Sequence, residues 1–93
     1  MPQGGCTMSR TMPIKSVMTL DGHLLQVTFH TGNCAVVNLK PYLQSIRFRA
    51  LSNQEIWETV DTNGGFIHWY QSGFMVVELA WNEVVEMLLG EWA

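Results

Sequence analysis

A histidine and a cysteine lie four positions apart in the segment FHTGNCAVVNLKPYL, residues 29 to 43, on either side of a Gly-Asn corner. A cysteine beside an imidazole can act as a nucleophile, and the same two residue types are common zinc ligands. Either chemistry needs a further partner, which is a group that orients the imidazole or at least one more metal ligand. The spacing also fits a simpler interpretation, in which His30 and Cys34 are only the two sides of a turn.

The other candidate ligands do not complete a metal site. Cys6 lies in the N-terminal segment, His23 falls on the opposite sheet face, and the sequence has no Cys-x-x-Cys or His-x-x-x-His pair. No oxyanion motif or phosphate-binding glycine pattern accompanies the two residues. We therefore expect no catalytic residue, no metal and no cofactor. A small enzyme or ligand binder that uses His30 and Cys34 stays open as an alternative.

The strands that position this pair begin with a hairpin. The apolar segments IKSVMTL (14–20) and HLLQVTFH (23–30) flank Asp21-Gly22, a dipeptide that two-residue hairpin turns favour because both positions need positive φ. A two-residue turn pairs Ser16 with Val27 and Ile14 with Phe29.

A second hairpin turn follows at Thr31-Gly32-Asn33. A three-residue loop keeps the apolar residues of both strands on one face, whereas a two-residue loop would bury Asn38 and Lys40 at a cost of a few kcal/mol. With the three-residue loop, His30 and Cys34 lie directly opposite each other on the other face. We interpret them as a cross-strand pair.

The rest of the chain alternates turn signals with apolar segments. Pro41 opens a short helical pattern in PYLQSIRF, and SNQE (52–55) fits a capping box with Ser52 as the cap of a second helix. Asn63-Gly64-Gly65 indicates another hairpin, and FMVVEL (74–79) reads as a further strand. The last segment, AWNEVVEMLLGEW, predicts a C-terminal helix with Asn82 as its cap and Gly90 as its end.

The sequence therefore predicts an α+β fold: an antiparallel β-meander and hairpins with two short helices and a C-terminal helix. Residues 1–11 are expected to form a disordered tail, and residues 12–93 a single domain. The predicted core consists of Leu25, Val27, Phe29, Val37, Leu39, Ile56, Trp57 and Trp69. No apolar segment reaches the roughly 20 residues of a membrane span, so we expect a cytoplasmic protein.

Charge is divided unevenly along the chain. Residues 1–50 hold five basic side chains and one acidic side chain, which gives +4, and residues 51–93 hold seven acidic side chains and no base, which gives −7. Lys40, Arg47 and Arg49 form a possible basic patch, so a nucleic-acid-associated regulator is a further alternative. A net-acidic chain with three clustered bases is a poor match to phosphate binding, and we do not expect nucleic acid as the partner.

Several segments resemble a known family. MPIKSV (12–17), LLQVTFHTGNCAVVNLKPYL (24–43) and FRALSNQEIWETV leading to GGFIHW (48–69) resemble the small bacterial domain-of-unknown-function family 2442, over roughly residues 12–89. The resemblance implies an α+β fold and no established activity. Some members of the family carry a helix-turn-helix domain or are encoded beside small partner proteins, as toxins and antitoxins are. After Trp69 the sequence departs from the family pattern.

Composition and residue placement predict a protein-interaction function. Only 14% of the residues are charged, against about 25% in an average domain, so part of the surface should be covered by another molecule. We expect a non-catalytic module that acts by self-association as a homodimer or as an antitoxin-like or adaptor partner of a small protein. In the C-terminal helix, Trp81, Val84, Val85 and Leu88 form the predicted core stripe. The predicted interaction surface consists of Phe66, His68, Tyr70, Phe74, Val77, Met87, Leu89 and Trp92.

Overall fold

Two antiparallel sheets of three strands each form the framework of the protein. The structure is a computed structural model that describes residues 13–90. The first sheet has the order β2-β3-β4, with β2 (Ile14–Leu20), β3 (Leu24–Phe29) and β4 (Cys34–Asn38). The second has the order β5-β6-β7, with β5 (Asp61–Thr62), β6 (Phe66–Gln71) and β7 (Phe74–Ala80). The predicted α+β fold is confirmed, whereas the predicted tail and Cys6 lie outside the described residues.

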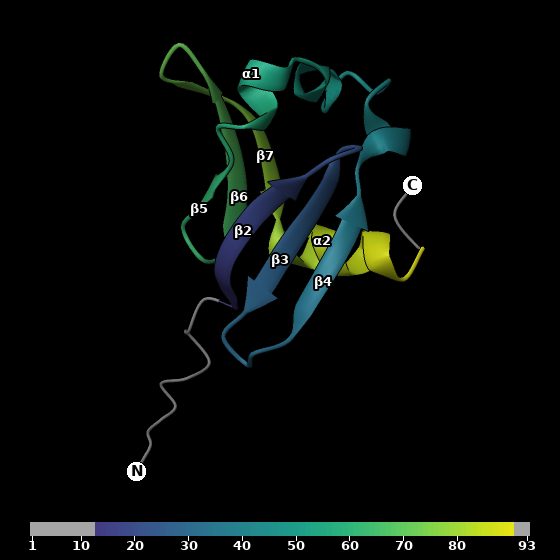
Figure 1. The fold of residues 1–93 in the computed structure, drawn as a ribbon, viewed down its shortest axis with the longest axis vertical. Helices are drawn as coiled ribbons and strands as arrows, with labels where there is room; N and C mark the ends of the chain where they lie inside the picture. Colours follow the sequence, from purple (N-terminus) through teal and green to yellow (C-terminus); the bar gives the residue numbers. More distant parts are fainter. Residues whose placement is uncertain (1–12, 91–93) are drawn as a thin grey trace.

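Short helices connect the two sheets. They are η1 (Lys40–Tyr42), η2 (Arg49–Ser52) and α1 (Gln54–Trp57), and α2 (Trp81–Leu88) follows the last strand. The short helices lie at one end of the sheets and α2 lies towards the other (Figure 1). Within residues 13–90, no helix is long and apolar enough to cross a membrane.

The core lies between the two sheets and receives side chains from the helices. Seven of the eight predicted core residues are buried, and the eighth, Phe29, is only half-buried. Trp57 and Trp69 form its centre: their rings stack with centroids 5.8 Å apart, and the Trp69 indole N–H donates to the Trp57 carbonyl at 3.1 Å. This contact joins α1 to β6.

The first hairpin differs from its predicted register. Its turn has three residues, because Gly22 and His23 both have positive φ, at 79° and 61°, and Leu24 rather than His23 pairs with Leu20. A β-bulge between Ile14 and Ser16 compensates for the extra residue. The pairing of Ile14 with Phe29 is therefore as predicted, but Val17 replaces Ser16 opposite Val27. The bulge moves an apolar side chain onto the core side.

The second pair of hairpin turns follows the sequence signals. The Asn63 side-chain oxygen accepts hydrogen bonds from the N–H groups of Gly65 and Phe66 at 3.0 and 2.9 Å, which closes the β5–β6 turn. Ser72 and Gly73, with φ of 54° and 84°, form the two-residue turn between β6 and β7. Both positions have the left-handed conformation that such hairpin turns require.

The helix ends depart from the predicted caps. Asn53, not Ser52, caps α1, and its side-chain oxygen accepts from the Glu55 N–H at 2.9 Å. The cap position of α2 is Ala80, not Asn82, and the Glu83 carboxylate accepts the Ala80 N–H at 3.0 Å. In both cases a side chain one position away from the predicted one reaches the free backbone donor.

The buried faces predicted for two segments, the C-terminal helix and residues 41–48, are also wrong. In α2 the buried residues are Val84 and Met87, whereas Trp81 and Leu88 are 43% and 44% exposed. Residues 41–48 form only the turn η1 followed by irregular turns, and Ile46 is 86% exposed. Periodicity alone predicts the core stripe of the C-terminal helix. The buried side of α2 depends instead on where the sheets pack against the helix, and that side carries Val84 and Met87.

Candidate functional site

His30 and Cys34 are not a cross-strand pair. Cys34 pairs with Thr28, and its sulfur lies 3.5 Å from the Thr28 hydroxyl. The His30 N–H instead donates to the Pro13 carbonyl at 3.0 Å, and the loop closes through a 2.8 Å bond from the Phe29 N–H to the Asn33 carbonyl. The loop is two residues longer than predicted, and a shift of two preserves the buried face. The sequence therefore predicts the correct face and the wrong partner for Cys34.

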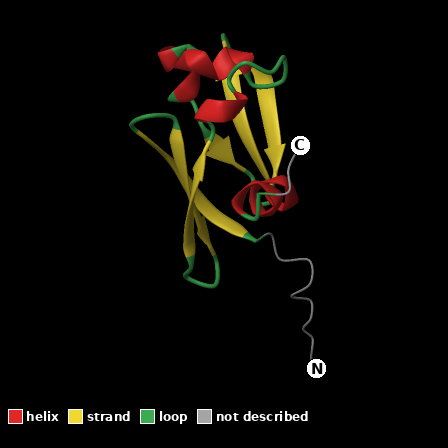
Figure 2. Cartoon of the chain, turned by 90° about the vertical axis from the view of Figure 1, so that its right-hand side faces the viewer, coloured by secondary structure: helices red, strands yellow, loops and turns green. Residues whose placement is uncertain are grey.

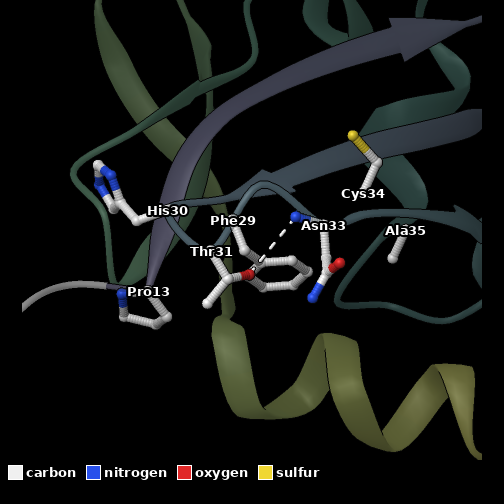
Figure 3. A pocket seen from close by; sticks show the side chains of 7 residues that line it. All are labelled: Pro13, Phe29, His30, Thr31, Asn33, Cys34 and Ala35. Atoms are coloured by element: carbon white, nitrogen blue, oxygen red, sulfur yellow. Dashed lines mark hydrogen bonds between the residues drawn. The ribbon is translucent and has the colours of Figure 1, made fainter.

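A pocket of about 490 Å³ lies at this loop. It is lined by Pro13, Phe29, His30, Thr31, Asn33, Cys34 and Ala35. Figure 3 shows the Phe29 ring at its centre, with the His30 imidazole and the Cys34 thiol pointing in different directions. Activation of Cys34 by an adjacent base would require contact with the His30 imidazole, but the neighbour of its sulfur is Thr28. In residues 13–90, no three His, Cys, Asp or Glu side chains are placed to hold a metal ion.

The predicted basic patch is divided by an ion pair. Arg47 donates two hydrogen bonds to the Glu83 carboxylate, at 2.5 and 2.6 Å, and its guanidinium lies 5.0 Å from the centre of the Phe48 ring. The hydrogen bonds to Glu83 raise the pKa of Arg47 above its ordinary value. The side chains of Lys40 and Arg49 are exposed and form no ion pair within residues 13–90. The Arg47 guanidinium is thus held within the fold by Glu83.

The same ion pair covers part of the outer edge of β7, which is the edge strand of its sheet. Arg47 donates to the Glu78 carbonyl at 2.7 Å, and Glu83 accepts the Ala80 N–H at 3.0 Å. These two bonds lie at the C-terminal end of β7, and no such bond is made by residues 74–77 among residues 13–90. We refer to this arrangement as the β7 edge cap, formed by Arg47 and Glu83.

Aromatic side chains line the face of the second sheet that points away from the core. Ile67 and Trp69 of β6 are buried, so the alternating residues Phe66, His68 and Tyr70 point outward. The Phe66 and His68 rings stack with centroids 6.2 Å apart and an angle of 14°, and the centroids of His68 and Tyr70 are 6.3 Å apart. The three rings form one continuous row.

Acidic residues flank this row on both neighbouring strands. Asp61 of β5 and Glu78 of β7 are the direct cross-strand partners of His68, and Glu78 contacts the imidazole at 3.2 Å. Met75 is the partner of Tyr70. We call this surface the outer aromatic face, and it consists of Asp61, Phe66, His68, Tyr70, Met75 and Glu78.

The predicted interaction residues are distributed between three environments. Phe66, His68 and Tyr70 belong to the outer aromatic face, and Phe74 and Leu89 are exposed elsewhere, at 75% and 66%. Val77 and Met87 are buried in the core and cannot take part in an exposed surface. Val77 is the cross-strand partner of Trp69, and Met87 is on the core side of α2. Trp92 lies outside the described residues.

Comparison with protein-family models, with curated proteins and with solved structures gives no match for this chain. The resemblance to domain-of-unknown-function family 2442 therefore stays a prediction, and function has to be inferred from the surfaces of the molecule itself.

Proposed function

We propose that this protein is a non-catalytic protein-interaction module that binds its partner through the outer aromatic face. The observation that carries the proposal is the row of Phe66, His68 and Tyr70, which lies on a sheet face opposite the core. In Figure 2 the first sheet and the short helices lie on one side of β6 and β7, and no helix or strand of residues 13–90 lies on the other side. Phe66 is 41% exposed and Tyr70 is partly exposed, whereas the His68 side chain between them is only 13% exposed. Aromatic side chains are enriched where protein surfaces meet.

Exposed apolar residues beside this face enlarge the proposed contact. Phe74, Met75 and Val76 at the start of β7 are 75%, 52% and 39% exposed, and they coincide with the open part of the β7 edge. Within residues 13–90, seven of the ten large exposed apolar side chains lie between residues 66 and 89. The second half of the chain therefore carries most of the surface that a partner could cover.

The other predicted functions receive less support. An enzyme that uses His30 and Cys34 lacks contact between the base and the thiol. A nucleic-acid regulator would use Lys40, Arg47 and Arg49, but Arg47 is held by Glu83. Phosphate recognition needs unpaired cations on one surface, and only two of the three candidates meet that condition.

A peptide-selection experiment tests the proposal. Random dodecapeptides displayed on phage are selected on the wild-type protein and assayed against two variants, Phe66→Ser on the outer aromatic face and Met18→Ser on the outer side of the first sheet. Both wild-type residues are about equally exposed, at 41% and 49%. We expect the selected peptides to bind wild type and Met18→Ser and to lose roughly tenfold or more in affinity for Phe66→Ser.

Circular dichroism of both variants checks that they fold. Failure to enrich any peptide, or equal loss of binding in the two folded variants, contradicts the proposal. Light scattering on the same samples determines whether a second copy of the chain is the partner, as the predicted homodimer requires.

The pocket at the β3–β4 loop supports a second candidate function, the binding of a small apolar ligand. Its volume of about 490 Å³ is in the range of small-molecule sites, and the Phe29 ring is part of its lining. Enhanced fluorescence of a hydrophobic naphthalene-sulfonate dye that is abolished by Ala35→Trp and retained by Phe66→Ser would support this candidate. Equal enhancement in both variants would exclude it.

We also propose a cytoplasmic location. Cys34 is a free and exposed thiol, which persists most readily in a reducing compartment. Alkylation of intact cells followed by mass spectrometry should find Cys34 alkylated as a thiol, and a mixed disulfide at this position would contradict the assignment.

A further inference from the structure

A second, polar pocket adjoins the outer aromatic face at Tyr70. It has a volume of about 270 Å³ and lies between α1 and the β6–β7 turn. Its lining residues are Asn53, Glu55, Ile56, Thr59, Tyr70, Gln71 and Ser72. Because Tyr70 belongs to both surfaces, a chain that lies along the aromatic row reaches the pocket without leaving the sheet.

Hydrogen bonds hold the walls of this pocket in place. The Thr59 hydroxyl donates to the Ile56 carbonyl at 2.6 Å and accepts the Tyr70 N–H at 2.8 Å, which ties the end of α1 to β6. Asn53 caps the start of α1. The pocket is therefore built before any partner arrives, and binding would require little reorganisation.

Four polar side chains of the pocket have no partner within the described chain. The Glu55 carboxylate makes no hydrogen bond or ion pair there, and neither do the Tyr70 hydroxyl and the side chains of Gln71 and Ser72. Three of these groups can accept or donate hydrogen bonds, and the fourth carries a full negative charge. The combination suits a cationic group with several N–H donors.

The electrostatics of the surrounding surface also favour a cation. Residues 51–93 contain seven acidic side chains and no lysine or arginine, and Asp61 and Glu78 flank the aromatic row. A second copy placed face to face about a twofold axis would bring Asp61 and Glu78 of both copies together. The positive groups nearest to them among residues 13–90 would be His68, which contacts Glu78, and Arg47, which is paired with Glu83. Like-charge contacts of this kind oppose binding. A different protein of basic character is the better occupant.

We propose that the outer aromatic face and its adjoining pocket bind an extended, arginine-containing segment of a partner protein, an inference that rests on the proposed function. One arginine of the partner enters the pocket, pairs with Glu55 and stacks on Tyr70. A second lies over the row between Asp61 and Glu78. Arginine suits both positions because its planar guanidinium stacks on aromatic rings and forms paired hydrogen bonds with carboxylates.

The spacing of the row indicates an extended segment. Centroids along Phe66, His68 and Tyr70 are 6.2 and 6.3 Å apart. Alternate side chains of an extended strand are about 6.5 Å apart, so every second residue of a partner strand can meet one ring.

Fluorescence anisotropy with a defined probe tests the inference. The probe is a labelled decapeptide in which arginine alternates with leucine, and the matched control peptide has citrulline, which is uncharged, in place of each arginine. We expect the citrulline peptide to bind roughly tenfold more weakly, which corresponds to about 1.4 kcal/mol. Glu55→Gln should weaken binding of the arginine peptide at least about fivefold. Glu86→Gln removes the same charge from an exposed site on α2 and should leave affinity unchanged.

Equal binding of the arginine and citrulline peptides overturns the inference, as does equal weakening by Glu55→Gln and Glu86→Gln, which would indicate only a net-charge effect. If phage-selected peptides depend on Phe66 but contain no arginine and ignore Glu55→Gln, the proposed function survives and this inference fails. If light scattering shows a dimer that Phe66→Ser dissociates, a second copy is the occupant and the basic partner is excluded.

Discussion

The two sheets of this protein share a construction and differ in the face that they present to solvent. Each is an antiparallel three-stranded sheet that buries one face in the common core. On the outer face of the first sheet, Gln26 pairs with Met18 and Val36, and Thr28 pairs with Ser16 and Cys34. The corresponding face of the second sheet carries stacked aromatic rings between two carboxylates.

This comparison shows which residues serve stability and which are available for function. The inward residues of both sheets are set by the need to bury apolar surface, so their types say little about activity. The first sheet has a polar and aliphatic mixture outside, which is ordinary for a solvated sheet face. The second carries a row of aromatic side chains on its outer face, which is the basis of the proposed partner site.

The largest expected difference in the free energy of unfolding is between substitutions on the two faces of β6. Trp69 is fully buried and stacks on Trp57, so Trp69→Ala should lower the free energy of unfolding by about 3–5 kcal/mol. Tyr70→Ala, one residue further and on the outer face, should cost less than about 1.5 kcal/mol. Urea denaturation of both variants measures the difference. Similar midpoints would mean that the inner and outer faces have been assigned incorrectly.

A second prediction compares two apolar residues of β3. Leu25 is fully buried, and Leu25→Ala should cost about 2–5 kcal/mol. Phe29 is half-buried and lies in the pocket at the β3–β4 loop, so Phe29→Ala should cost less than Leu25→Ala despite the larger side chain, about 1–2 kcal/mol. Chemical denaturation decides the order. A larger cost for Phe29→Ala would show that the pocket is closed around the ring in solution.

The third prediction concerns the ion pair between Arg47, in the loop after the first sheet, and Glu83 of α2. Arg47→Met removes the bonds to Glu83 and to the Glu78 carbonyl and should cost about 1–2 kcal/mol. Because the pKa of Arg47 is raised by Glu83, its charge and this contribution persist throughout neutral and mildly alkaline pH and are lost only as the pH rises through that raised pKa.

Arg49→Met is the matched control, since the Arg49 side chain is exposed and forms no ion pair within residues 13–90, and it should change stability by less than about 0.5 kcal/mol. Thermal unfolding at neutral pH compares the two variants. Equal effects would show that the bonds of Arg47 add nothing beyond an exposed surface charge.

The smallest expected effects on stability come from substitutions on the outer faces of the two sheets. Phe66→Ser and Met18→Ser should each change the free energy of unfolding by no more than about 1 kcal/mol, because both side chains are largely exposed. The variants should nonetheless differ in peptide binding. A strongly destabilised Phe66→Ser protein would indicate that the aromatic row is part of the fold and would remove the contrast between the sheets.

The sequence predicts best those features that depend on local chemistry or on alternation. Asn63-Gly64-Gly65 and Ser72-Gly73 form the turns that their residue types favour. Alternation also placed Phe66, His68 and Tyr70 on one face. Turn length is harder to predict, because the observed loop at residues 29–33 and the predicted three-residue loop at residues 31–33 bury the same side chains. The pairing of Cys34 could therefore not be decided by apolar pattern.

Contacts between distant segments were not predictable from the pattern. Arg47 and Glu83 are 36 positions apart, and only the opposite charge of the two halves of the chain suggested such a link. The buried side of α2 depends on how the sheets approach it, which is why Met87 was predicted outside and lies inside. The polar pocket at Tyr70 needs α1 and the β6–β7 turn to meet, and nothing in either segment alone indicates that.

The β7 edge cap also affects how the protein behaves at high concentration. An open strand edge can recruit strands from other copies and grow into fibrils, and many proteins prevent this with a covering loop or a proline. Here the ion pair bonds the Glu78 carbonyl and the Ala80 N–H, and a β-bulge interrupts the strand near Met75. Substitution of Arg47 or Glu83 would free one of these backbone groups, and we therefore expect such a variant to form fibrils more readily than the wild-type protein.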